Sequence, residues 1–533
     1  FLPGQSTVPP IDRDEPRYTQ ATKQMMETGD YVRIRFQDEP RHKKPIGIHW
    51  LQAGAAQLTG LGADAPLWVY RLPSLLGAVA ALLLTFWAAR AFLSPGLAAT
   101  AALLFGATII LGVEARLAKT DAVLLATILG AQGALARLWL NKERWRVAAV
   151  LFWVSLALGI LVKGPIAPMV CGLTIVLLLA LDGRGLLKRL MPVSGLVILA
   201  VICLPWYVAI YNATDGAFFS AAIGKDFLGK AVDGQEGHGA PPLVHLAFFL
   251  AVAWPLSPLA VAALWRGGRE RGTVMVFCLA WALPSWIVFE LTPTKLPHYT
   301  MPLMPAIAIA SVTALSRAAP PRWLSRLAGA ALVVGPLGIL LAGPILAWQL
   351  GALGETTGAL INWFDLVIAG AIVAVALGAA VAAAMAAWQG IGLVQTRVIV
   401  PAVLAATITQ AAVWGIGLPA LQPVWVSPRL VATVEAVAPC ETPRIASVGG
   451  FNEPSMIFLA GTDTALVKAD EAIAIAGAQC TVIAVRQRAV EAVLAAADTA
   501  GTPLTESGVV EGFNISKGDP VKITLYTVSE VAQ

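Results

Sequence analysis

Twelve long apolar runs constrain the fold of this chain more than any other feature of its sequence. Each run holds about 17 to 25 residues, the length that a helix needs to cross a bilayer. Lipid offers no partner to backbone amides and carbonyls, and uninterrupted runs differ from the alternating strands of a membrane barrel, so helices are expected. The sequence therefore predicts a polytopic α-helical membrane protein. The runs are 71–93, 97–113, 121–140, 147–162, 164–181, 191–211, 241–265, 273–290, 299–316, 327–350, 364–388 and 398–419.

The basic residues between the runs indicate how the chain is oriented. Alternate connectors carry fifteen Lys and Arg residues, whereas the connectors on the opposite side carry six. Cytoplasmic loops are enriched in these residues, so the first set is expected in the cytoplasm. The even number of runs then places residues 1–70 and the chain after residue 420 on the other side. The apolar start at Phe1 suggests a further helix upstream, which would make thirteen spans, or the end of a cleaved signal peptide.

The composition changes after the last run, where β-rich segments alternate with helical patterns. The expected strands are 444–448, 481–485 and 521–528, and the expected helices are 428–437 and 489–497. This pattern predicts a small α/β domain packed on the outer, periplasmic surface. The chain thus divides into a first outer loop, residues 1–70, a transmembrane domain, residues 71–420, and the α/β domain, residues 421–533.

Two cysteines in this last region could form a disulfide. Cys440 and Cys480 each precede an expected strand, so neighbouring strands would bring them close. Disulfides persist in oxidising compartments, and two free thiols are the alternative.

A charged island, residues 12–32 and 43–50, precedes the first run. Residues 15–27 are expected to form an amphipathic helix that ends at Gly29, and residues 45–58 a second helix that turns Trp50 and Leu51 towards the membrane interface. Helices lying on the membrane surface would hold Asp14 and Glu15 near the lipid headgroups.

The inferred topology gathers further polar residues on the same side, and ionisable residues near membrane depth are usually functional. These are Glu114, Arg116, Lys119, Asp121, Lys163, Lys295, His298 and Tyr299. Carboxylates beside cations suit displacement at a carbon that bears a phosphate leaving group, because an acid can accept a proton while cations stabilise phosphate oxygens. No nucleic-acid motif and no nucleotide-binding glycine fingerprint is found, so an activated lipid is the expected donor.

At these residues the sequence resembles the C-class glycosyltransferases that use polyprenyl-phosphate sugars, namely the lipid A aminoarabinose transferases and the related protein O-mannosyltransferases. The resemblance rests on the order of DEPRY, GDYV, KPIGIHW, RLPSLLG, ARLAKTDAVLLA, KGPIAP, LPWYV and KLPHYTMPLMPA. A small periplasmic α/β domain after the last span favours the aminoarabinose branch.

The resemblance implies that Asp14 is the catalytic carboxylate; the alternative is an N-cap for the following helix. Glu15 would assist, or it would only favour the helix dipole. Lys44 would contact the donor phosphate, together with Lys295 and Arg116. Lys43 stands where family members often carry an acid, which suggests a more anionic ligand, although a solvated lysine is the alternative.

Other matched residues have less defined roles. Asp121 could orient a sugar, bind a divalent cation or pair with a neighbouring cation, and whether a metal is required stays open. His298 is expected to be a neutral hydrogen-bonding group beside Tyr299 in the donor cavity. Arg17 and Tyr18 would brace Asp14, and Lys163 could simply snorkel. The glycine-rich loop 212–240 is expected to be either a lid or a disordered connector. The resemblance favours a lid, with Lys225, Asp226 and His238 as its candidate residues.

The sequence thus predicts a bacterial inner-membrane glycosyltransferase with its site in the periplasm. Its partners would be a polyprenyl-phosphate sugar donor, a lipid A or other lipopolysaccharide acceptor, and membrane lipids, with no nucleic acid. Single displacement would invert the anomeric centre. The alternatives are transfer to protein Ser or Thr, and a transporter of lipid-linked sugars.

Overall fold

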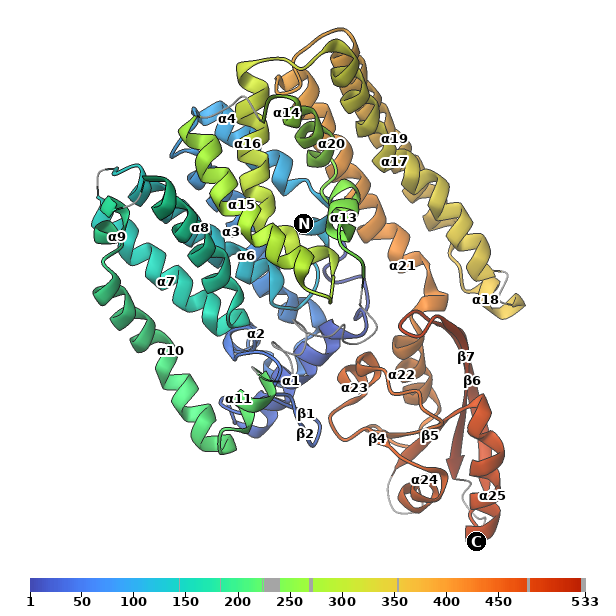
Figure 1. Cartoon of the computed structure of the whole chain (residues 1–533). Helices are drawn as coiled ribbons and strands as arrows, with labels where there is room; N and C mark the ends of the chain where they lie inside the picture. The colour runs from blue at the N-terminus through green and yellow to red at the C-terminus, as the bar shows by residue number, and fades with distance from the viewer. Residues whose placement is uncertain are drawn as a thin grey trace.

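Most of the molecule is a bundle of apolar helices (Figure 1). The computed structural model describes residues 1–142, 144–182, 184–222, 224, 240–267, 272–351, 354–476 and 480–528. The bundle helices are α3 (Leu67–Ala89), α4 (Pro95–Gly106), α5 (Ile109–Glu114), α6 (Asp121–Trp139), α7 (Trp145–Lys163), α8 (Ile166–Asp182), α9 (Arg184–Leu190), α10 (Pro192–Thr214), α11 (Ala217–Phe219), α13 (Val244–Val252), α14 (Leu256–Gly267), α15 (Thr273–Leu291), α16 (Met304–Arg317), α17 (Arg322–Gly351), α18 (Glu355–Ala359), α19 (Trp363–Trp388), α20 (Thr396–Ala412) and α21 (Leu418–Ala420).

Each of the twelve apolar runs is helical, but three differ from a straight span. Within the described residues, nine helices are long and apolar enough to cross a membrane, or ten if α13 and α14 form one span. These two helices meet at 120° around Pro255, a residue that cannot continue a helical hydrogen-bond ladder. Helices α4 and α8 are shorter than a full span. The chain is therefore a polytopic helical membrane protein, and the number of spans stays a prediction.

Two amphipathic helices precede the bundle, close to their expected bounds. Helix α1 (Asp14–Thr28) ends at Gly29, whose φ of 69° is the left-handed conformation typical of a helix end. Helix α2 (Gly47–Leu58) follows the short hairpin β1 (Arg35–Phe36) and β2 (Glu39–Pro40). Trp50 and Leu51 are 40% and 46% exposed, as expected of side chains directed towards a membrane interface.

A close backbone approach fixes α2 against the bundle. A side chain at Gly47 would place its Cβ 2.7 Å from the carbonyl oxygen of Leu161 on α7. Only glycine therefore allows this contact. It holds the loop that carries Lys43 and Lys44 beside the end of α7, where Lys163 lies.

The C-terminal domain, defined here as α22 to β7, is a three-layer α/β unit. Its sheet has the order β4-β3-β5-β7-β6, in which β3 runs parallel to β4 and β5, and β7 runs antiparallel to β5 and β6. Alternate residues of β5 enter two separate cores: Val482 packs with α22 and α23, and Ile483 packs with α24 and α25. The elements are α22 (Val426–Val437), β3 (Arg444–Val448), α23 (Pro454–Ala460), β4 (Ala465–Leu466), α24 (Ala469–Ala476), β5 (Thr481–Arg486), α25 (Val490–Ala500), β6 (Leu504–Asn514) and β7 (Asp519–Val528).

A disulfide links Cys440 to Cys480 in this domain. The two residues precede β3 and β5, which are hydrogen-bonded neighbours, and Thr481 pairs with Arg444. The strands expected from the sequence are present, whereas β6 was missed because Gly508 and Gly512 interrupt its pattern.

Helix α1 and the C-terminal domain lie at the same end of the bundle (Figure 1). Helix α1 packs against both α2 and α23. Two distant parts of the sequence, residues 14–58 and the C-terminal domain, therefore meet at α1, the helix that begins at Asp14.

Candidate functional site

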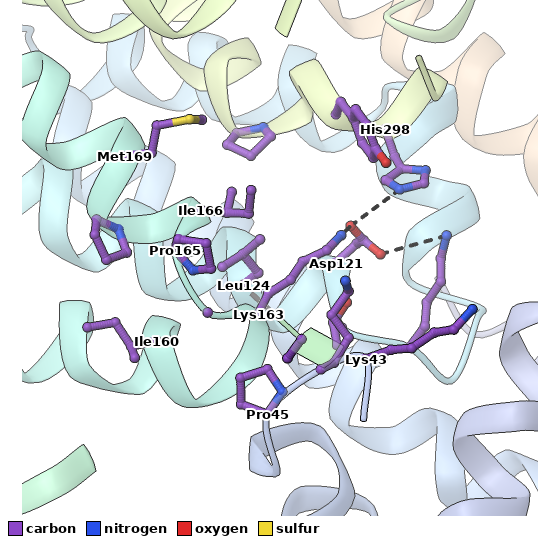
Figure 2. A pocket seen from close by; sticks show the side chains of 18 of the residues that line it. Lys43, Pro45, Asp121, Leu124, Ile160, Lys163, Pro165, Ile166, Met169 and His298 are labelled. Carbon is purple, nitrogen blue, oxygen red and sulfur yellow. Dashed lines mark hydrogen bonds and ion pairs between the residues drawn. The ribbon is translucent and has the colours of Figure 1, made fainter. Parts of the chain in front are cut away.

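A large cavity opens where α1, the loop before α2, and helices α6, α7, α8, α10, α11 and α15 converge. Its volume is about 1020 Å³. Ionisable and polar side chains line one part of it: Asp14, Tyr18, Arg41, Lys43, Lys44, Lys119, Thr120, Asp121, Lys163 and His298. Apolar side chains line the rest, among them Ile160, Ile166, Met169, Leu204, Tyr207, Val208, Phe218, Phe219, Phe289 and Leu296. Figure 2 shows the contrast, with Asp121, Lys163 and His298 close together and Ile160, Pro165 and Met169 on the other side.

Asp121 is the centre of the charged part. It is the first residue of α6, and its Oδ1 lies 2.6 Å from Lys163 Nζ at the end of α7. Lys119 Nζ lies 3.8 Å from its Oδ2 and 2.9 Å from Glu114 Oε1. His298 Nε2 lies 3.7 Å from Asp121 Oδ1. Two acids and two lysines thus form a paired network, so Lys163 does more than snorkel.

Asp14 also lines the cavity. It is exposed and belongs to the first turn of α1, whose N-cap position is occupied by Arg13. Tyr18 follows one helical turn later, and the guanidinium of Arg41 lies 5.1 Å from the centre of its ring. Burial raises the pKa of Tyr18 to about 12, so its phenol stays protonated and can donate a hydrogen bond to a bound oxygen. Arg17 does not line the cavity.

Glu15 lies outside the cavity and has a structural environment. It is 1% exposed, and its two carboxylate oxygens lie 2.7 and 2.8 Å from Nε and Nη2 of Arg71. The same carboxylate accepts hydrogen bonds from the backbone amides of Ile11 and Ala118. Glu15 is thus bound on all sides by protein groups and does not line the cavity. Its position does not support the expected role of assisting Asp14 in catalysis.

Two of the residues expected to bind phosphate also lie elsewhere. Arg116 donates to the carbonyl oxygens of Pro3 and Gly112 at 2.6 and 2.7 Å and lies against Trp414. Lys295 Nζ donates to the carbonyl oxygen of Thr292 at 2.6 Å. Neither residue lines the cavity, whereas Tyr299 does. Sequence proximity placed these side chains in the right loops but could not give their directions.

Sequence reasoning missed Arg41 and the aromatic wall of the cavity. Arg41 lies two positions before Lys43 in the same loop. Leu204, Tyr207, Val208 and Tyr211 follow the spacing of one face of α10, a signal that was present in the sequence.

Lys225, Asp226 and His238 of the expected lid lie outside the described residues. In the part of the chain that is described, no group of three or more His, Cys, Asp or Glu side chains could hold a metal ion.

One known family and several named relatives match part of this chain by sequence. The family described as dolichyl-phosphate-mannose-protein mannosyltransferase matches residues 43–208. An undecaprenyl phosphate-α-4-amino-4-deoxy-L-arabinose arabinosyl transferase from Edwardsiella ictaluri is 25% identical over 319 residues, 58% of this chain and 55% of that protein. Its counterpart from Pseudomonas aeruginosa is 25% identical over 305 residues, 56% of this chain and 54% of that protein. The chain thus matches little more than half the length of these relatives.

The likeness to solved structures extends over the whole chain. The crystal structure of ArnT from Cupriavidus metallidurans bound to undecaprenyl phosphate has a TM-score of 0.78 at 18% identity, covering 99% of this chain and 96% of that one. The apo structure of the same protein gives 0.75. This chain therefore has the C-class glycosyltransferase fold and is similar to the aminoarabinose transferases.

Proposed function

We propose that this protein transfers a sugar from a polyprenyl-phosphate carrier to an acceptor hydroxyl or phosphate on lipid A or another lipopolysaccharide. One observation carries the proposal: a single cavity joins a lysine-rich charged part, bordered by the exposed carboxylate of Asp14, to an apolar wall. A lipid-linked sugar phosphate has the same two-part character. The curated relatives carry this donor in their names.

The apolar wall would hold the first isoprene units of the donor. Aromatic and aliphatic side chains from α10, α11 and α15 form it, and burying apolar surface contributes about 25 cal/mol per Å². The phosphate would then lie where the apolar and charged parts meet. Lys43, Lys44 and Arg41 border that position, and cations beside phosphate oxygens make strong charge-assisted contacts.

Asp14 would act as the general base. Its carboxylate takes the proton of the acceptor oxygen while that oxygen forms a bond to the anomeric carbon. The bond from this carbon to the donor phosphate breaks, and its electron pair leaves with the phosphate. The lysines stabilise the added negative charge, and a single displacement inverts the anomeric centre. Asp121, already paired with Lys163, would fix that lysine and a sugar hydroxyl.

The cation distribution of the connectors supports a site that faces the periplasm from the bacterial inner membrane. Transfer to Ser or Thr of a protein is the second candidate, because the family that matches residues 43–208 is described as a protein mannosyltransferase.

The test is the Asp14→Asn variant of the purified protein, assayed with undecaprenyl-phosphate aminoarabinose and lipid A. We expect transfer to fall at least about 100-fold, the lower end of the roughly 100- to 10,000-fold contribution of a positioned general base. Binding of undecaprenyl phosphate should be retained. The control is Asp30→Asn, which removes an acid that follows α1 and does not line the cavity.

Full turnover of Asp14→Asn would refute the assigned base. Transfer to a Ser- or Thr-containing peptide but not to lipid A would favour the second candidate. For the phosphate contact, Lys44→Ala should weaken binding of undecaprenyl phosphate about 10-fold, whereas Lys142→Ala, an equal charge change far from the cavity, should not.

A further inference from the structure

A contact between the C-terminal domain and the segment before α1 lies only two residues from Asp14. The carboxylate of Asp12 accepts hydrogen bonds from the backbone amide of Ser455, at 3.0 Å, and from its hydroxyl, at 2.5 Å. The two residues are 443 positions apart in sequence. The contact therefore exists only when the C-terminal domain is folded and docked.

The Ser455 side of this contact is rigidly supported. Ser455 is 1% exposed, and its hydroxyl also contacts that of Ser427 on α22 at 2.7 Å. The adjacent Glu453 accepts a hydrogen bond from Asn514 at 2.9 Å. On the other side of Asp12, Arg13 Nη2 donates to the carbonyl oxygen of Ser516 at 3.2 Å. Both residues that lead into Asp14 are thus held by the C-terminal domain.

The position of Asp12 limits the position of Asp14. Two residues span at most about 7 Å of extended chain, so the Asp14 carboxylate cannot move far while Asp12 is held. A general base must lie within about 3 Å of the proton that it takes, and a misplacement of about 1 Å can lower a rate about 100-fold.

We infer that the C-terminal domain sets the place of the catalytic carboxylate through Asp12 and Ser455, which act as positioning residues for the transfer reaction. The inference rests on the proposed function of Asp14. The domain thereby takes part in catalysis although, among the described residues, it contributes no side chain to the cavity lining.

Other contacts keep the domain docked when this one is removed. Gln20 Nε2 donates to the hydroxyl of Thr462 at 2.7 Å, and Gln37 Nε2 donates to the carbonyl oxygens of Thr462 and Thr464 at 3.1 and 2.6 Å. Loss of the Ser455 hydroxyl should therefore displace the segment before α1 without releasing the domain. This makes a positioning effect separable from unfolding.

The experiment uses the full chain with the variants Ser455→Ala, Asp12→Ala and Asp12→Asn. We expect Asp12→Ala to lower kcat about 10- to 100-fold and Ser455→Ala about 10-fold, with the Kd for undecaprenyl phosphate within 2-fold of wild type. Asp12→Asn keeps an acceptor oxygen for the Ser455 amide and should retain kcat within about 3-fold. Ser447→Ala is the matched control, since it removes a buried serine hydrogen bond to Phe451 inside the same domain.

Wild-type kcat in Asp12→Ala, or an equal loss in Ser447→Ala, would overturn the inference. A readout that needs no substrate separates it from the proposed function: amide hydrogen exchange of residues 8–16 should rise in Ser455→Ala and stay unchanged in Ser447→Ala. If exchange rises while Asp14→Asn remains fully active, the contact orders the segment but Asp14 is not the base. If exchange does not rise, the positioning role itself is refuted.

Discussion

The segment that carries Asp14 is held from two directions by contacts of different kinds. The transmembrane side uses the ion pair of Glu15 with Arg71, whose side chain is fully buried. Arg71 also donates to the carbonyl oxygens of Gly4, Gln5, Val8 and Pro9. The C-terminal side uses separate hydrogen bonds, such as those from Ser455 to the Asp12 carboxylate and from Gln20 to the Thr462 hydroxyl.

This difference has an energetic meaning. A buried charge that loses its partner is left in a medium of low dielectric, so the transmembrane contact is all or none. A single hydrogen bond contributes about 1 kcal/mol, or about 1.5–3 kcal/mol when one partner is charged as Asp12 is, so the C-terminal contact can loosen one bond at a time. Substitutions in the Glu15–Arg71 ion pair should therefore cause a large loss of stability in one step. Substitutions in the hydrogen bonds to the C-terminal domain should cause smaller losses that add up bond by bond.

The largest effect is expected when the ion pair is broken on one side only. Arg71→Met should lower the free energy of unfolding by about 3–5 kcal/mol, because Glu15 stays buried without its partner. The double variant Glu15→Met with Arg71→Met should be less destabilised than Arg71→Met. Thermal unfolding in detergent measures both, and a double variant that is less stable than the single one would contradict the explanation.

Loss of the disulfide should affect the C-terminal side alone. Cys440→Ser with Cys480→Ser removes a link across 40 residues, and such links contribute about 2–4 kcal/mol. Limited proteolysis should show faster cleavage within α22 to β7 and an unchanged rate in the bundle. Equal acceleration in both parts would mean that the two regions unfold as one unit.

The contact at Asp12 should respond to pH. Burial raises the pKa of Asp12 to about 6 from 3.8, with Glu453 adding to the rise and the Ser455 hydrogen bonds opposing it. The folded state therefore keeps the proton to higher pH than the unfolded state. The contribution of Asp12 to stability is therefore greatest below about pH 4 and falls by about 3 kcal/mol as pH rises through about 6. Amide hydrogen exchange of residues 8–16, corrected for intrinsic rates, should therefore become faster between about pH 4 and pH 6 in the wild type. The corrected rate should not change with pH in Asp12→Asn.

The smallest effect is expected when the hydroxyl of Thr462 is removed. Thr462→Val removes the hydroxyl that accepts from Gln20 and donates to Glu27. The cost should be about 1 kcal/mol, with kcat nearly unchanged because the segment before Asp14 is not touched. If Thr462→Val lowered the free energy of unfolding as much as Arg71→Met, the proposed difference between the transmembrane contact and the C-terminal contact would be wrong.

Local patterns predicted the helices well and the contacts poorly. Apolar runs and capping signals placed α1, α2 and the bundle helices within a few residues, because these features act between near neighbours. The pairings Glu15–Arg71 and Asp12–Ser455 join residues 56 and 443 positions apart, and no spacing rule reaches so far. The directions of side chains in the loops could not be predicted from the sequence either. Lys119 lines the cavity, whereas Arg116, three positions earlier, does not.

The order of synthesis gives the cavity a further property. Every described residue that lines it lies between Asp14 and Pro302, so the ribosome completes the lining well before Ser455 is made. Domains generally fold in the order in which they emerge. A nascent chain would thus possess a donor cavity before the carboxylate is fixed in place, and the last part to be synthesised would be the part that completes the site.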